Sequence, residues 1–273
     1  MKRVISLLAL CAILTMNYVY AQNKTLELLW ETTENIHVPE SVLYHEQTDK
    51  LYVSMIGKDG TENGKIATLR PDGTVENAQW VTGLNAPKGL GIHQGLLYIA
   101  DITKVIVVDI ITSNIVDEIQ IEGSTFLNDI TIDNNGIVYI SDTRDNKIYQ
   151  LRNGKISLFL DNVPSVNGLK YYQGKLLALA GKEFWSIDSN KKIEVFAKGF
   201  EQGGDGLEPL KDGSFIVTCW PGIIYHISSQ GEILKIQDVQ GKMNTADLGY
   251  NHKESVIYVP TFNNNSVIAY KLK

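Results

Sequence analysis

Polar side chains that could bind a cation recur in this 273-residue sequence at intervals of about 40 residues. They stand at the starts of six aligned short apolar segments, at Glu40, Lys88, Asn128, Asn167, Asp205 and Ala246, and five of these six residues are polar. Two carboxylates and two carboxamides are hard oxygen donors, which suit Ca²⁺, Mg²⁺ or Mn²⁺. No His or Cys falls on these positions, so a typical structural zinc site is not expected. Lys88 offers an alternative, because a buried ion pair with Glu40 or Asp205 needs no metal. The residues alone leave both interpretations open.

The segments that carry these residues form a repeat of short strands. In each unit an inner strand leads through a turn to a second strand rich in β-branched and aromatic residues, and third and fourth strands follow. The second strands begin at Leu51, Leu96, Ile137, Leu176, Phe215 and Val256. Six units of four strands, without a segment that resembles a long helix, predict an all-β fold, a six-bladed β-propeller.

The two ends of the chain predict how this propeller closes. The last unit stops after its third strand, at Lys273, while an unused strand lies at residues 25–30. That N-terminal strand can supply the outer strand of the last blade and leave no open seam. In a propeller the inner strands begin near the central axis at one end, so the six aligned side chains should face one another. We call them the axial ring.

The N-terminal segment has the pattern of a secretory signal peptide. Lys2 and Arg3 precede a mostly apolar stretch over residues 4–16, and Val19-Tyr20-Ala21 fits a cleavage site before Gln22. The stretch is short for a membrane span, although an uncleaved anchor is the alternative. The sequence therefore predicts a signal peptide at residues 1–21, a propeller domain at 22–273, and export to a periplasmic or extracellular space.

Composition excludes several other classes of protein. The net charge of −6 argues against a nucleic-acid surface. No second long apolar stretch occurs, so the mature chain is expected to have no membrane span. Cys219 is the one cysteine beyond the signal peptide and cannot form an internal disulfide. The expected partner is a small-molecule ligand or substrate, and the sequence does not indicate an oligomeric state.

Four short motifs, in blade order, resemble those of a known family. Pro39-Glu40, Asn128-Asp129, Asn167-Gly168-Leu169 and Asp205-Gly206-Leu207 are similar to motifs of the senescence marker protein/gluconolactonase/luciferin-regenerating enzyme family. The resemblance covers essentially the whole mature chain. A further stretch, residues 138–148, is similar to the NHL-type repeats of six-bladed propellers, which many non-enzymes share.

The family resemblance implies a metal-dependent hydrolase of a lactone or small ester. It implies a divalent cation held by Glu40, Asn167 and Asp205, with Ca²⁺ as the first expectation and Mg²⁺, Mn²⁺ or Zn²⁺ as alternatives. Asn128 would lie close to the metal or the substrate. In such a site the cation polarises the carbonyl, and Asp205 is the candidate general base.

Three further residues bear on the substrate. Phe126 stands where the family's sugar-lactone members commonly place an Arg, which favours a more apolar substrate than a sugar acid lactone. Lys88 points a cation towards the expected metal and could bind a substrate oxygen or replace the metal. Trp220 could form an aromatic wall of the pocket or pack between blades. A non-catalytic propeller that binds a small molecule, peptide or glycan is therefore the alternative function, and the sequence leaves open whether the chain is an enzyme.

Overall fold

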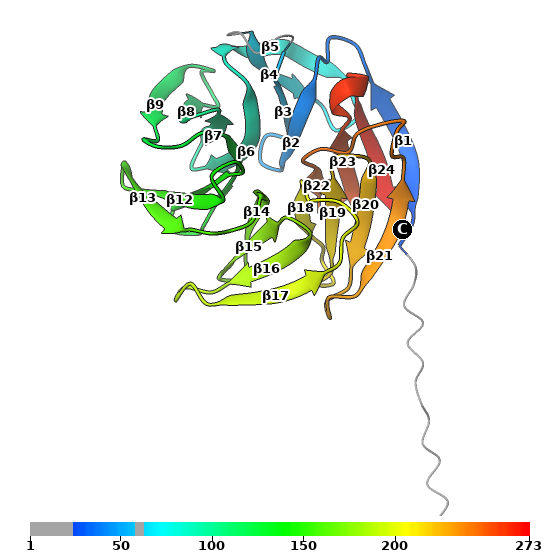
Figure 1. The fold of residues 1–273 in the computed structure, drawn as a ribbon. Coiled ribbons are helices and arrows are strands. Elements are labelled where there is room, and N and C mark those ends of the chain that lie inside the picture. Colours follow the sequence, from blue (N-terminus) through cyan, green and yellow to red (C-terminus); the bar gives the residue numbers. More distant parts are fainter. Residues whose placement is uncertain (1–23, 58–62) are drawn as a thin grey trace, which may run out of the picture.

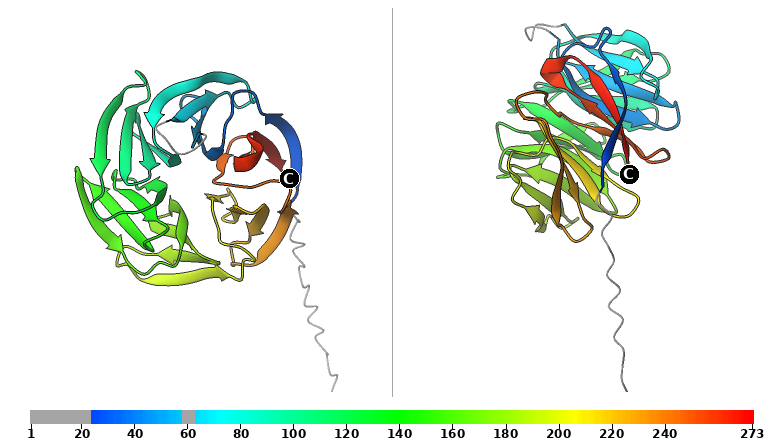
Figure 2. Two further views of the ribbon diagram at one scale, coloured as in Figure 1. Left: turned by 45° about the horizontal axis from the view of Figure 1, so that its top comes forward. Right: turned by 90° about the vertical axis from the view of Figure 1, so that its right-hand side faces the viewer.

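The chain folds into six four-stranded antiparallel sheets arranged as blades around a central axis (Figures 1 and 2). The structure, a computed structural model, describes residues 24–57 and 63–273. The predicted six-bladed propeller is confirmed. The predicted signal peptide at residues 1–21 lies outside the described residues. Within the described ranges, no helix has the length and apolar character needed to cross a membrane.

Five blades run from an inner strand to an outer strand in sequence order, and in the sixth the outer strand is the N-terminal strand β1. The inner strands are β2 (Pro39–His45), β6 (Pro87–His93), β10 (Leu127–Ile132), β14 (Val166–Tyr172), β18 (Leu207–Pro209) and β22 (Gly249–Asn251). The second strands are β3 (Lys50–Met55), β7 (Leu96–Asp101), β11 (Val138–Asp142), β15 (Lys175–Ala180), β19 (Phe215–Cys219) and β23 (Val256–Pro260). The third strands are β4 (Gly64–Leu69), β8 (Lys104–Asp109), β12 (Lys147–Arg152), β16 (Glu183–Ile187), β20 (Ile223–Ile227) and β24 (Val267–Leu272). The outer strands are β5 (Val75–Leu84), β9 (Ile115–Gln120), β13 (Lys155–Leu160), β17 (Ile193–Lys198), β21 (Ile233–Asp238) and β1 (Leu26–Thr32), and one 3₁₀ turn, η1 (Phe262–Asn264), follows β23.

The hydrophobic core lies between neighbouring blades. Every residue of β11, β19 and β23 is buried, because both faces of a second strand are covered by adjacent blades. One apolar cluster joins Val105 and Val107 of the second blade to Leu127 and Ile140 of the third. The outer strands are mostly exposed, as in β9. Burial of the apolar inner strands therefore fixes the blades around the axis.

The N-terminal strand closes the ring as predicted. Strand β1 pairs antiparallel with β24, from Leu26 opposite Leu272 to Thr32 opposite Val267. Figure 1 shows β1 at the outer edge beside β24. The Trp30 ring lies 5.8 Å from that of Tyr258, and Trp30 Nε1 donates a hydrogen bond of 2.9 Å to Pro71 O in the first blade. The first and last blades are thus joined by one strand.

β-Bulges place the axial side chains. In β2, Pro39 is paired with Met55 and Ser41 with Ser54, which leaves Glu40 as the extra residue. The same irregularity follows Pro87 in β6, Leu127 in β10 and Val166 in β14. A bulge bends the strand locally and redirects a side chain, and bulges are common beside active sites. Glu40, Lys88, Asn128 and Asn167 all lie at these bulges.

Glycine follows the axial ring in three blades because the neighbouring blade comes very close. These glycines are Gly89, Gly168 and Gly206. A Cβ at Gly89 would overlap the backbone and carboxylate of Asp129, and a Cβ at Gly206 would overlap Asp247 and Leu248. The spaces left by these glycines are therefore occupied by carboxylates and backbone of the next blade.

We expect Gly89→Ala to lower the free energy of unfolding by about 3 kcal/mol, because its methyl group meets backbone that cannot move freely. Chemical denaturation would measure the change. Gly203→Ala is the matched control, since Gly203 is exposed and a Cβ there meets no atom closer than 3.7 Å. Similar stability of the two variants would contradict the close packing of the second and third blades at Asp129.

Candidate functional site

Glu40 and Lys88 form a buried pair at the end of the central axis where the inner strands begin. We call this end the mouth of the axis. Glu40 is 5% exposed and Lys88 is 6% exposed, and Lys88 Nζ lies 3.6 Å from Glu40 Oε1. The second carboxylate oxygen, Oε2, is buried and has no hydrogen-bond partner among the described residues. A buried oxygen without a partner is unfavourable. Lys88 therefore satisfies only half of the Glu40 carboxylate.

Asp205 and Asn167 lie together on adjacent blades. Asn167 Nδ2 donates a hydrogen bond of 2.7 Å to Asp205 Oδ1. Asp205 is 3% exposed. It precedes β18, and its backbone N–H donates to Thr218 O at 2.7 Å, which holds it beside the second strand of the fifth blade. Since Asn167 donates through its nitrogen, its carboxamide oxygen is directed elsewhere.

Asn128 is held within its own blade. Its Nδ2 donates to Thr143 Oγ1 at 3.0 Å, and Thr143 Oγ1 donates to Val166 O at 2.7 Å. Asn128 is 6% exposed. Its carboxamide is therefore oriented by the loop between β11 and β12, and Thr143 links this loop to the fourth blade.

Two further carboxylates, Asp129 and Asp247, lie just below the axial ring. Both oxygens of Asp129 accept backbone hydrogen bonds of 2.6 Å, from Ile130 N and Leu169 N. Asp247 Oδ2 accepts a hydrogen bond of 2.5 Å from Ser41 Oγ. Neither residue is among the site residues predicted from the sequence. The sequence feature that could have indicated these two carboxylates is the glycine found at the equivalent position of neighbouring blades.

The axis therefore concentrates negative charge. Burial raises the pKa of Glu40 despite the attraction of Lys88, and it raises the pKa of Asp129 to about 7. Burial, followed by the nearby charge of Glu40, raises the pKa of Asp205 well above its usual value. Burial and the charge of Asp129 do the same for Asp247. Each carboxylate is thus less stable as an anion than in water, and Lys88 alone does not balance them.

The channel below these residues is narrow. It has a volume of about 30 Å³ and is lined by residues of all six blades. Lys170 and Glu208 form an ion pair of 2.6 Å in its wall. This volume is comparable to that of one water molecule. A substrate must therefore approach the axial ring from the end where the inner strands begin.

The backbone before Glu40 is strained. Val38 has φ +47°, which is unusual for a β-branched residue, and its N–H donates to Asn265 Oδ1 at 2.8 Å. Val38 lines a depression of about 640 Å³ together with His37, Met55 and Lys65. The unusual Val38 backbone and its hydrogen bond to Asn265 of the sixth blade hold the segment of chain that leads to Pro39-Glu40 at the mouth of the axis.

The two aromatic residues predicted for the site, Phe126 and Trp220, lie in different surroundings. Phe126 lies against the axial ring, because Lys88 Nζ is 4.8 Å from its ring centroid. Trp220 is 40% exposed and packs edge-on against Phe262 of the sixth blade, with 5.4 Å between centroids. Phe126 therefore belongs to the predicted group of residues around Lys88, whereas Trp220 packs between the fifth and sixth blades.

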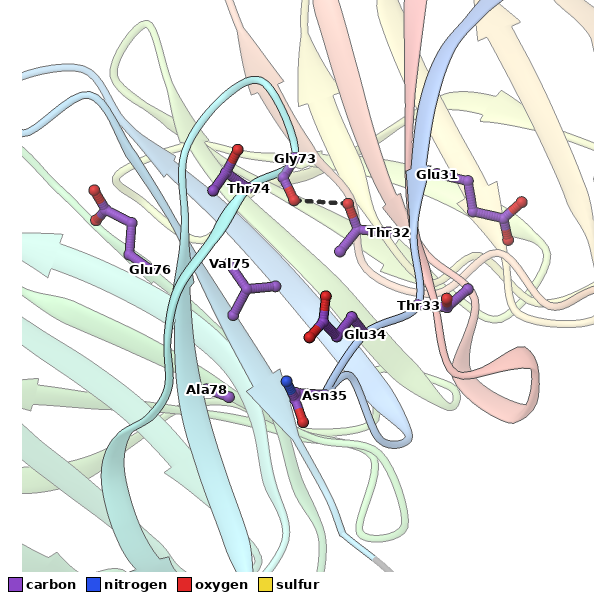
Figure 3. Close-up of a pocket in the computed structure, with 10 residues that line it drawn as sticks. All are labelled: Glu31, Thr32, Thr33, Glu34, Asn35, Gly73, Thr74, Val75, Glu76 and Ala78. Atoms are coloured by element: carbon purple, nitrogen blue, oxygen red, sulfur yellow. Dashed lines mark hydrogen bonds between the residues drawn. The ribbon is translucent and has the colours of Figure 1, made fainter.

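A separate groove of about 600 Å³ lies at the closure of the propeller, where β1 passes the turn between β4 and β5 (Figure 3). Thr32 Oγ1 donates to Gly73 O at 2.7 Å across it. Of its three acidic residues, Glu31, Glu34 and Glu76, two have side-chain partners: Glu31 accepts a hydrogen bond from Ser266, and Glu76 pairs with Lys50 and Arg70. This groove is formed by closure of the ring and contains no axial residue.

No protein-family model matches the chain, and no curated protein matches it. Solved structures do share its fold. A streptogramin B lyase has a TM-score of 0.70 at 12% identity, covering 92% of this chain and 98% of that chain. A catalytically inactive virginiamycin B lyase from Staphylococcus aureus, with quinupristin, has a TM-score of 0.65 at 13% identity, covering 92% and 100%.

A gluconolactonase from Xanthomonas campestris also shares the fold. Its TM-score is 0.66 at 14% identity, and the match covers 91% of this chain and 89% of that chain. This neighbour is consistent with the resemblance seen in the sequence motifs. At such identities the likeness shows the fold, and the chemistry must be argued from the axial residues.

The donor set is compatible with a hard cation. In the described part of the chain, no three His, Cys, Asp or Glu side chains are grouped as metal ligands. The expected set, however, has two carboxylates, from Glu40 and Asp205, and a carboxamide from Asn167. The partnerless Glu40 Oε2 and the raised carboxyl pKa values fit a site that accepts positive charge.

Proposed function

We propose that this protein is a metal-dependent hydrolase of a lactone or small ester, with a divalent cation bound at the axial ring. The observation that carries the proposal is the buried Glu40 carboxylate, whose Oε2 has no partner in the described residues and which faces further carboxylates. Glu40, Asn167 and Asp205 would hold the cation, with Ca²⁺ as the first candidate. When bound, it would polarise the substrate carbonyl as a Lewis acid.

The protein's own residues would then position the substrate and move a proton. Asp205 would accept a proton from the attacking water and return it to the leaving alkoxide. Water oxygen bonds to the carbonyl carbon as the ester C–O bond breaks, so hydrolysis needs no other reactant. Asn128, oriented by Thr143, would hold a substrate oxygen. Lys88 would stabilise negative charge near Glu40.

Elemental analysis and a chelation experiment test this proposal. We expect one divalent cation per purified chain and hydrolysis of at least one member of a panel of lactones and small esters. Chelation should reduce that rate by at least about 100-fold, and added Ca²⁺ should restore it.

The alternative is a propeller that binds a small molecule, peptide or glycan without catalysis. The Lys88–Glu40 pair favours it, because Lys88 can neutralise the axial charge without a metal. Absence of a bound cation in elemental analysis and calcium titration, with no hydrolysis of the panel, would establish that alternative over the hydrolase.

A further inference from the structure

Arg144 presents an unpaired guanidinium beside the mouth of the axis. It is exposed and lies in the loop between β11 and β12, directly after Thr143. Within residues 24–57 and 63–273, no carboxylate pairs with it and no acceptor bonds to it. Its acidic neighbours are engaged elsewhere: Asp142 accepts hydrogen bonds from Thr125 N and Phe126 N, and Asp145 pairs with Lys147.

The guanidinium is nevertheless held in place. Its Cζ lies 4.3 Å from the centroid of the Phe126 ring. Phe126 is itself fixed to the Arg144 loop, since its N–H donates to Asp142 Oδ1 and its carbonyl accepts from Thr143 N at 3.1 Å. Stacking on an aromatic ring orients an Arg while leaving its edge N–H groups able to donate.

The same aromatic ring connects Arg144 to the axial ring. Lys88 Nζ lies 4.8 Å from the Phe126 centroid and 3.6 Å from Glu40 Oε1. Asn128 is bonded to Thr143, the residue before Arg144. The side of the mouth formed by the second and third blades thus carries two cations, while Glu40 and Asp205 place negative charge at the axis.

This arrangement selects a particular kind of ligand. A planar guanidinium with free donors matches a carboxylate, which it binds through two parallel hydrogen bonds. Because Arg144 is exposed and stacks on Phe126 beside the axial ring, it offers such a carboxylate a partner while an ester carbonyl approaches the ring. We propose that Arg144 determines specificity by binding a carboxylate of the substrate, so that the preferred substrate is a lactone or small ester that also carries a carboxylate. This inference rests on the proposed function for its reaction, but the carboxylate site can be tested separately.

A pair of lactones that differ only in charge provides the kinetic test. The pair is 5-oxotetrahydrofuran-3-carboxylic acid and its carboxamide. For Arg144→Gln we expect kcat/KM for the acid to fall about 10- to 100-fold, with most of the change in KM, and the preference for acid over amide to disappear. Arg144→Lys should recover part of that preference through its charge. Arg152→Gln is the control, because Arg152 is an exposed residue at the opposite end of β12.

A binding experiment separates this inference from the proposed reaction. Calorimetry would measure binding of (hydroxymethyl)succinate, the dicarboxylate that opening of the acid lactone would form. Binding by the unmodified protein that is weakened at least tenfold in Arg144→Gln supports the carboxylate site even if no lactone is hydrolysed. Equal binding by both proteins, no binding by either, or equal losses for the acid and the amide would overturn it.

Discussion

Asp205→Asn should reduce kcat/KM for lactone hydrolysis by about 10³-fold and abolish binding of the divalent cation. Asn retains the shape of the side chain and can still accept the hydrogen bond from Asn167. It lacks the charge that attracts a cation and the basicity that accepts a proton. Steady-state kinetics and calcium titration would measure the two losses.

The same substitution should not weaken the metal-free fold. Burial and the charge of Glu40 raise the pKa of Asp205 well above its usual value. A carboxyl group whose pKa is higher in the folded than in the unfolded chain stabilises the fold at low pH, and that stabilisation is lost as pH rises towards the folded value. At pH 7 the charge of Asp205 is therefore unfavourable, and its removal should raise Tm in the presence of a chelator.

Comparison with a surface variant completes this experiment. Asp161→Asn removes the same charge from an exposed position and should leave both turnover and cation binding unchanged. If Asp205→Asn retained turnover within about twofold of the unmodified protein, Asp205 would not be the base. If it lost activity only together with a large decrease in Tm, its role would be structural.

The architecture could be predicted because it repeats in the sequence. Apolar second strands and their turns recur in every blade, so one ambiguous strand is supported by the other five. The closing strand was also predictable, because the last unit lacks an outer strand and residues 25–30 form an additional one. Both features depend on local sequence patterns, which can be recognised without knowledge of side-chain contacts.

The axial site was only partly predictable. The start of each inner strand identified Glu40, Asn167 and Asp205, but the bulges that direct side chains to the axis have no distinct local sequence pattern. Asp129 and Asp247 were missed because their importance depends on spaces left by glycines in other blades. The roles of the predicted residues remain predictions.

The loops at the mouth were the least predictable part. Phe126 suggested a more apolar substrate when considered alone. In the structure, Arg144 from a different loop stacks on Phe126 and places a positive charge on this side of the mouth. Such contacts join residues from different strands and turns, and the repeat pattern does not specify them.

Removing the closing strand should prevent stable folding. A chain of residues 33–273 lacks β1, so β24 becomes an unpaired edge and the sixth blade keeps three strands. An exposed strand edge with apolar residues favours aggregation. We expect residues 24–273 to unfold cooperatively and residues 33–273 to aggregate or to lack a cooperative transition, as measured by circular dichroism and size-exclusion chromatography.

A single substitution tests the same closure in a chain that still folds. Trp30 contacts Tyr258 in its own blade and bonds to Pro71 O in the first blade, so Trp30→Ala removes both contacts. We expect a loss of about 2–4 kcal/mol in the free energy of unfolding, towards the lower part of the range for large core residues because Trp30 is only half-buried. Leu29→Ala is the control on the same strand, since Leu29 is 47% exposed. Equal effects of the two substitutions would mean that β1 contributes through its backbone pairing alone, and that the Trp30 contact does not join the first and last blades.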